Sequence, residues 1–179
     1  MVERAAGRYV AAARWLHWLT AGSILVIFTT GIWLGRFEPT DEDFKRAIYN
    51  QHESFGVLVF LLTLVRLMVR WRNPPPPLPA DMGAGVKLVA GLNHAALYVL
   101  LVVQPTVGFL NTNAWGFPLM WFGLVPVPSP IGESQVWAPV LSNLHFAGAI
   151  AMAVLLGAHI AGVVHHTFIR RDGLLSRMA

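Results

Sequence analysis

No cysteine occurs at any of the 179 positions of the sequence. This absence excludes disulfide bonds, thiolate metal sites, iron–sulfur clusters and the covalent attachment of a c-type haem. A metal site in this chain must therefore use histidine or oxygen ligands. Charged residues are also scarce, at 12%, whereas hydrophobic residues make up 55%. Because an ordinary soluble domain is about 25% charged, this composition predicts a surface that largely faces lipid.

Long stretches without charge explain the composition. A helix needs roughly 20 apolar residues to cross a hydrocarbon core of about 30 Å. Residues 15–35, 88–132 and 134–169 carry no formal charge, and 49–71 is interrupted only by Glu53, Arg66 and Arg70. The first segment is too long for the apolar core of a cleavable signal peptide, so we interpret it as a retained helix. The predicted fold class is all-α: one four-helix transmembrane domain over residues 1–179, with helices at about 11–35, 48–72, 86–110 and 139–168.

The basic residues follow this topology and are not gathered on one helical face. Four spans place both termini and the loop after the second helix on one side of the membrane. That side holds ten basic and three acidic residues, so its net charge is 10 − 3 = +7; the other side holds three basic and six acidic residues, which gives 3 − 6 = −3. Arg4 and Glu3 belong to the first side, and Glu38 to the second. Since basic loops remain in the cytoplasm, we predict a multi-pass protein of the bacterial inner membrane with both termini cytoplasmic. Nucleic acid is not expected as a partner, although the pI is about 10.1.

The second external loop, residues 111–137, is rich in Trp, Phe, Gly and Pro, as in "NTNAWGFPLMWFGLVPVP". Aromatic side chains of this kind anchor segments at the membrane–water interface. Two interpretations follow: the loop is a lid over a site, or it is an interfacial anchor with no role toward a substrate.

Histidine is the unusual feature of the predicted helices. Each of the seven histidines falls inside or at the end of a span: His17, His52, His94, His145, His159, His165 and His166. An ionisable side chain in hydrocarbon is costly without a partner, and neutral imidazole is the commonest metal ligand. The alternative for any single histidine is a hydrogen bond to a neighbouring helix.

The spacing of two histidines in the last helix indicates two sites at different depths. His145 and His159 are 14 residues apart, so they share one helical face and lie about 21 Å apart along the axis. The first helix enters from the cytoplasm with His17 near its start, and the second enters from outside with His52 near its start. The pairs predicted are therefore His17 with His159 and His52 with His145. Two bis-histidine haem sites use all four residues, whereas zinc favours a compact cluster of three or four ligands.

Other residues near these histidines support the prediction weakly. Gly56, Gly148 and Gly162 lie three or four positions after a histidine, where a haem could pack, although glycine also serves ordinary helix packing. Arg14, Arg66 and Arg70 near the inner surface are candidates for contacts with haem propionates or are snorkelling side chains that mark topology. We interpret His94, His165 and His166 as structural; the alternative is a role beside the inner haem or a quinone.

The segments "ARWLHWLTAG", "NQHESFGVLVFLLTLVRLMVRWRNPPPPLP", "LNHAALYVLLVVQPTVGFL" and "NLHFAGAIAMAVLLGAHIAGVVHHTFIRRDGLLSRM" resemble the bacterial cytochrome b561 family. Nearly the whole chain takes part in this resemblance. That family shares its four-helix di-haem core with cytochrome b subunits of formate dehydrogenases and nickel hydrogenases. The resemblance implies two b-type haems, with iron ligands at His17, His52, His145 and His159. It also implies ubiquinone as an electron acceptor in the membrane and, for superoxide oxidase-like members, external superoxide as the donor.

Three functions remain open from the sequence. The first is an oxidoreductase that passes electrons from a periplasmic donor, superoxide, to membrane quinone. The second is a haem-bearing electron-transfer or anchor subunit for a partner dehydrogenase or hydrogenase, and the third is a histidine-lined transporter, which fits the paired depths poorly. Lys45 and Arg46 precede His52 by seven and six residues and are candidates for steering an anionic donor. The acidic run at 41–43 opposes that role.

Overall fold

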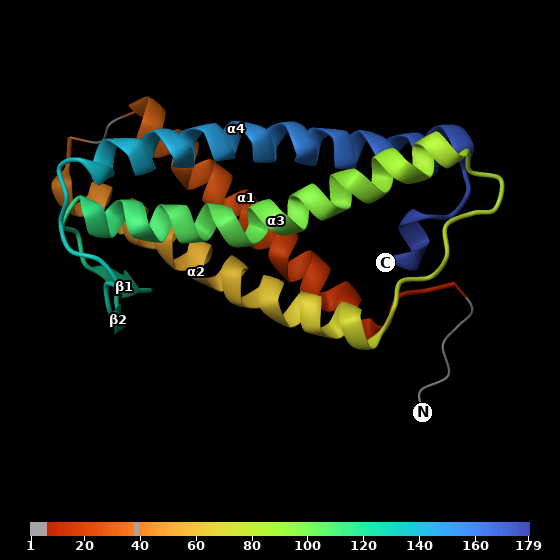
Figure 1. Ribbon diagram of the computed structural model, residues 1–179, viewed down its shortest axis with the longest axis horizontal. Helices are drawn as coiled ribbons and strands as arrows, with labels where there is room; N and C mark the ends of the chain where they lie inside the picture. Colours follow the sequence, from red (N-terminus) through yellow and green to blue (C-terminus); the bar gives the residue numbers. More distant parts are fainter. Residues whose placement is uncertain (1–6, 38–39) are drawn as a thin grey trace.

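Four long helices form the molecule in the computed structural model, which describes residues 7–37 and 40–179. Glu3, Arg4 and Glu38 of the charge argument lie outside these ranges. Each helix is long and apolar enough to cross a membrane, and together they form a bundle (Figure 1). The all-α, four-helix prediction is therefore confirmed. The helices are α1 (Ala11–Phe37), α2 (Glu42–Arg72), α3 (Ala84–Ala114) and α4 (Trp137–Val164), and α4 continues into a π-helical segment, His165–Arg170.

The ends of the helices differ from the predicted ends. Helix α2 starts at Glu42 instead of about residue 48, because Asp41 is an N-cap whose side chain accepts a hydrogen bond from the backbone N–H of Phe44 at 2.8 Å. The acidic first turn suits the positive end of the helix dipole. Helix α3 runs on to Ala114 instead of about residue 110, although it contains Pro105. The predicted helix of about 48–72 left out residues 42–47, because that prediction followed hydropathy runs and did not include the cap at Asp41.

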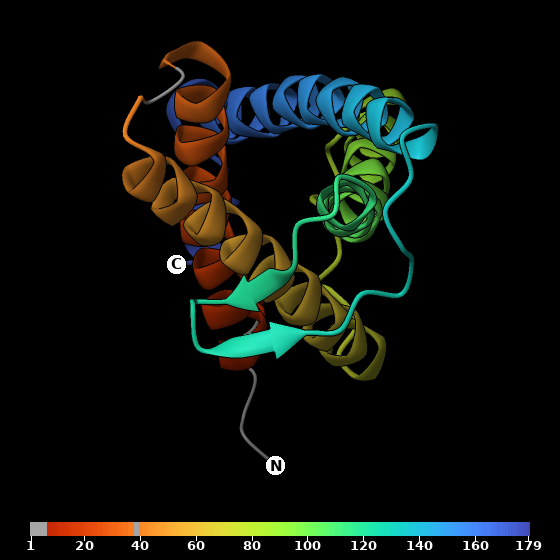
Figure 2. The ribbon, with the colours of Figure 1, turned by 90° about the vertical axis from the view of Figure 1, so that its left-hand side faces the viewer.

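Small polar residues and a short apolar core hold the bundle together. Helix α1 packs on α2, α2 on α3, and α3 on α4; Figure 2 shows the arrangement from one end. Thr20, Ser23 and Thr63 are buried, and each hydroxyl donates to the carbonyl four residues earlier. A hydroxyl satisfied in this way lets helices approach closely in lipid. The apolar core comprises Val59, Leu97, Leu101 and Met152, whereas most other large apolar side chains are exposed, as expected for surfaces that face lipid.

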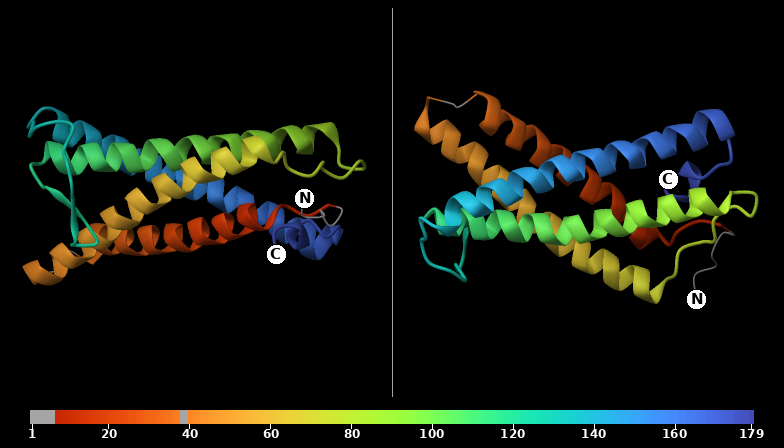
Figure 3. Two further views of the ribbon diagram at one scale, coloured as in Figure 1. Left: turned by 90° about the horizontal axis from the view of Figure 1, so that it is seen from below. Right: turned by 45° about the horizontal axis from the view of Figure 1, so that its top comes forward.

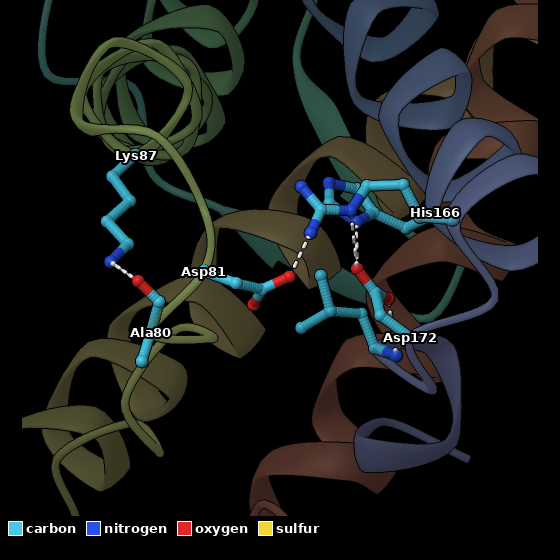
Figure 4. Close-up of polar contacts among 7 residues, drawn as sticks. Ala80, Asp81, Lys87, His166 and Asp172 are labelled. Carbon is cyan, nitrogen blue, oxygen red and sulfur yellow. Dashed lines mark hydrogen bonds and ion pairs between the residues drawn. The ribbon is translucent and has the colours of Figure 1, made fainter.

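The two ends of the bundle are built differently. At the end named here the terminal end, residues 7–10, 73–83 and 171–179 come together (Figure 3). The backbone N–H of Tyr9 donates to the carbonyl of Arg177 at 3.1 Å, and the Arg177 side chain donates to the carbonyl of Pro77 at 2.7 Å. Figure 4 shows further polar contacts there, including the ion pairs of Arg170 with Asp81 and of His166 with Asp172. The segment after α4 therefore ties two other chain segments together.

A β-hairpin covers the opposite end, named here the hairpin end. Strands β1 (Leu119–Trp121) and β2 (Val125–Val127) are antiparallel. Phe122 and Gly123 at the turn have φ of 50° and 72°, which is typical of a type I′ turn. Three hydrogen bonds fasten the hairpin to α2: Asn50 donates to the carbonyl of Met120, Trp121 Nε1 to the carbonyl of Ser54, and the backbone N–H of Phe122 to Ser54 Oγ. The loop predicted at 111–137 thus contains the last turn of α3 and an ordered hairpin.

Candidate functional site

Two pairs of histidines face one another across the bundle, at different depths. His17 of α1 and His159 of α4 have ring centroids 6.3 Å apart. His52 of α2 and His145 of α4 have ring centroids 6.0 Å apart. The first pair lies toward the terminal end and is called the terminal pair; the second lies toward the hairpin end and is called the hairpin pair. The structure therefore brings together the residues that the depth argument matched.

The separation within each pair fits two imidazoles on one metal ion. A metal–imidazole bond is about 2.0–2.1 Å long and the bonded nitrogen lies about 1 Å from its ring centroid, so two such rings on opposite sides of a metal are about 6 Å apart. In the described part of the chain, no group of three or more His, Asp or Glu side chains could hold a metal ion. Paired neutral imidazoles are a donor set suited to haem iron. The residues present therefore fit two b-type haems better than a zinc cluster.

In the hairpin pair, a backbone carbonyl orients the His52 ring and a glycine packs against it. His52 Nδ1 lies 3.0 Å from the carbonyl oxygen of Ile27 and 3.2 Å from the hydroxyl of Thr30. Since a carbonyl only accepts, Nδ1 carries the hydrogen and Nε2 keeps a lone pair for a metal. A Cβ added to Gly31 would lie 3.0 Å from the His52 ring, a tight contact, so glycine lets this ring approach α1 closely.

A glycine also packs against the His145 ring. A Cβ added to Gly108 would lie 2.8 Å from His145 Cε1. The Nδ1 atom of His145 is buried and has no hydrogen-bond partner among the described residues. The side chain of Gln104 on α3 donates to the backbone carbonyl of His145 on α4 at 2.6 Å. The Nδ1 atom of His145 is therefore a buried polar group that the described residues leave unsatisfied, unlike Nδ1 of His52.

The terminal pair has polar and charged neighbours. Arg66 Nη2 lies 3.3 Å from His17 Nδ1. A guanidinium only donates, so Nδ1 accepts and the neutral ring carries its hydrogen on Nε2. Binding of a metal through Nε2 would place the hydrogen on Nδ1, so the Arg66 contact and metal binding exclude each other. His94 of α3 packs edge-on against His159, with ring centroids 5.2 Å apart.

The glycines and arginines named from the sequence have different surroundings. Nothing lies within 4 Å of a Cβ built on Gly56 or Gly162, whereas a Cβ on Gly148 would strike the side chain of Gln104. Arg14 donates to the Ala179 carbonyl at 2.7 Å, away from the histidines. Arg66 and Arg70 both lie over the ring of Tyr98.

Sequence reasoning missed three residues at these sites: Gly31, Gly108 and Tyr98. The sequence did contain a signal for the two glycines. Gly31 on α1 and Gly108 on α3 lie in the part of each helix nearer the hairpin end, where the hairpin pair also lies. Tyr98 had a weaker signal, its position one turn after His94 on α3.

The remaining candidates lie away from the two pairs. Lys45, now in the first turns of α2, has its ammonium 3.6 Å from the Glu42 carboxylate, so part of its charge is balanced; Arg46 is exposed. His165 packs against His166. His166 Nδ1 lies 2.5 Å from the Asp172 carboxylate, so both residues belong to the terminal end.

Comparison with known proteins identifies the family of the chain. Residues 8–179 match the prokaryotic cytochrome b561 family. The chain belongs to this family. It is 32% identical to cytochrome b561 homolog 2 of Escherichia coli, over 96% of this chain and 90% of that protein. It is 24% identical to the probable superoxide oxidase CybB of Yersinia pestis, over 91% of this chain and 90% of that protein. As a cytochrome b561 family member, the chain is a multi-pass membrane protein that binds b-type haem and takes part in electron transfer.

Proposed function

We propose that this cytochrome b561 family member is a di-haem oxidoreductase that accepts electrons from superoxide at the periplasmic face and passes them to membrane quinone. In this proposal His52 and His145 hold one haem, and His17 and His159 hold the other. The terminal end faces the cytoplasm, because the predicted charge asymmetry of +7 against −3 follows the positive-inside rule. The 24% identity to a protein named as a probable superoxide oxidase supports superoxide as the donor.

The observation that carries the proposed direction is the unequal charge around the two pairs. Arg66 comes within 3.3 Å of His17, and both Arg66 and Arg70 lie over the ring of Tyr98. Among the described residues, neither ring of the hairpin pair bonds to or stacks with an arginine or lysine; instead Glu53 follows His52 and accepts a hydrogen bond from Thr112 at 2.6 Å. Positive charge stabilises an added electron and so raises a reduction potential. The electron should therefore move from the hairpin end to the terminal end.

The two sites span enough of the bilayer for such a transfer. His145 and His159 are separated by 14 residues on the continuous helix α4, which corresponds to about 21 Å along the axis. A b-type haem bound at each pair supplies reversible one-electron chemistry at its iron. Each superoxide loses one electron to become O₂, and a quinone takes up two electrons and two protons to become quinol, so two superoxide ions are oxidised for each quinone reduced.

The residues of the chain contribute positioning and steering. The carbonyl of Ile27 fixes the His52 tautomer that presents Nε2. Gly31 and Gly108 allow both hairpin-pair rings to lie close against neighbouring helices. Lys45 and Arg46, about 9 to 10 Å from His52 along α2, would raise the local concentration of a small anion.

The test uses the purified chain alone, in detergent and in vesicles that contain ubiquinone. Superoxide should reduce the haem in rapid-mixing absorbance measurements, and quinone should reoxidise it. The His52→Ala variant serves as a control that should lose the fast phase of reduction. A haem that superoxide leaves oxidised, but that is reduced when a dehydrogenase or hydrogenase subunit is added, would instead establish the electron-transfer-subunit function.

A further inference from the structure

Helix α3 carries none of the proposed iron ligands, yet its Tyr98 ring lies against Arg66, the arginine that reaches His17 of the terminal pair. The guanidinium carbon of Arg66 lies 5.3 Å from the centroid of the Tyr98 ring, and that of Arg70 lies 5.7 Å from it. Both distances are within the range of about 6 Å over which a cation is attracted to an aromatic face. Tyr98 therefore contacts two cations that are one helical turn apart on α2.

Arg66 has two contacts, and only one of them is compatible with a ligand role for His17. The contact with His17 Nδ1 at 3.3 Å requires an unprotonated Nδ1, whereas metal binding through Nε2 requires a protonated one. The contact with Tyr98 makes no such demand. When His17 serves as a ligand, the Tyr98 ring is the contact that keeps Arg66 inside the bundle.

In a membrane, the contact of the two arginines with Tyr98 affects where their charges lie. Long arginine side chains near the end of a membrane helix otherwise extend toward the headgroup region, where water solvates the charge. Arg70 is exposed and Arg66 is half-buried, so neither is held by a close-packed core. An aromatic face that attracts both guanidiniums holds Arg70 close to Arg66, whose guanidinium comes within 3.3 Å of the His17 ring.

We propose that Tyr98 is a positioning residue of the terminal haem site, because its ring holds Arg66 and Arg70 where they face the propionates of the haem bound by His17 and His159. This inference rests on the proposed function only in assuming a haem at the terminal pair. It assigns to Tyr98 a role in setting the reduction potential of that haem and no role in ligating it.

The test is a redox titration of Tyr98→Leu, with haem content measured on the same sample. The variant should keep two haems per chain. Release of the arginines should lower the equilibrium constant for reduction of the terminal haem by up to about tenfold, which is about 59 mV for a one-electron couple. The potential of the hairpin haem should not change. Tyr98→Phe, which keeps the ring face, should behave as the wild type.

Two further comparisons separate positioning from packing. Phe55→Leu removes an aromatic ring that packs on Phe122 at the hairpin end and should leave the terminal potential unchanged. In a chain that already carries Arg66→Gln and Arg70→Gln, Tyr98→Leu should cause no additional shift, because the charges that it positions are gone.

The inference is wrong if Tyr98→Leu leaves the terminal potential at the wild-type value, if Tyr98→Phe shifts it equally, or if the shift persists without the arginines. Should Tyr98→Leu fail to retain the terminal haem, Tyr98→Phe and Tyr98→Trp decide: both retain a ring face, and a lowered potential in both would overturn the inference. A wild type with fewer than two haems contradicts the proposed function instead, so the two failures are distinguishable.

Discussion

The hairpin pair and the terminal pair use the same two side chains in different surroundings. His52 and His145 rest against glycines, and the hydrogen bond that fixes the His52 tautomer is donated by Nδ1–H to a backbone carbonyl. His17 and His159 instead face an arginine and a third histidine. The first environment fixes geometry with little charge, whereas the second adds positive charge. Identical ligands can thus hold haems of different potential, because the surroundings of a ligand tune the metal.

Removal of a histidine should produce the largest effect. His52→Ala or His145→Ala should remove or perturb the same haem, and His17→Ala or His159→Ala should affect the other one. Haem extraction and a redox titration of each variant measure the outcome. His94→Ala is the matched control at the terminal end and should keep close to two haems per chain. A His17 variant that lost the same redox component as a His52 variant would contradict the pairing, and with it the contrast between the two ends.

Substitution of the glycines should have the second-largest effect, and it should affect the hairpin haem alone. Gly108→Ala would place a Cβ 2.8 Å from the His145 ring, and Gly31→Ala would place one 3.0 Å from His52. Both variants should lower occupancy of the hairpin haem several-fold and leave the terminal haem in place, as judged by haem content and redox titration. Gly56→Ala, where nothing lies within 4 Å, is the control that tests whether a glycine beside a ligand matters in itself. Equal losses in all three variants would show that glycine has a general packing role.

Donor entry should respond to charge at the hairpin end. Replacement of both Lys45 and Arg46 by Gln should slow haem reduction by superoxide several-fold and weaken its dependence on ionic strength, since salt screens over about 8 Å at physiological concentration. Rapid-mixing measurements at two salt concentrations test this, and reoxidation by quinone should be unchanged. An unaltered rate and salt dependence would move the entry site elsewhere, with the edge of the hairpin as the next candidate.

The smallest expected effect concerns the ion pairs of the terminal end. Partial desolvation raises the pKa of the Asp172 carboxyl, but hydrogen bonds from His166 and the Leu174 N–H, together with the charges of His166 and Arg170, outweigh it and hold the pKa below its usual 3.8. A depressed carboxyl pKa stabilises the folded state above the unfolded value, and this contribution is lost as pH falls through the folded value. Asp172→Asn should therefore lower the thermal unfolding midpoint at pH 7, by the equivalent of about 1 kcal/mol or less. The difference from wild type should shrink below pH 3.8; a difference that stayed constant down to the lowest pH would exclude the carboxylate as its source.

Hydropathy and helical spacing were sufficient to predict four spans and the depths of the histidines. Both properties are local: lipid requires about 20 apolar residues per span, and a regular helix converts 14 residues into a known rise and rotation. The ends of α2 and α3 were predicted less well, because a capping side chain or a proline tolerated within a helix outweighs average hydropathy there. A loop rich in Trp, Gly and Pro likewise did not predict a hairpin that bonds to Ser54 of α2.

What the sequence determined by itself is therefore the number of spans, their charge asymmetry and the depth of each histidine, since each depends on residues near in the chain. Only the tertiary structure decided which glycines lie against the histidine rings, that Gly148 lies against Gln104, and that two arginines lie over the Tyr98 ring. Such contacts depend on how each helix is rotated and tilted against its neighbours. Rotation and tilt are set by packing between helices far apart in sequence, which no local period encodes.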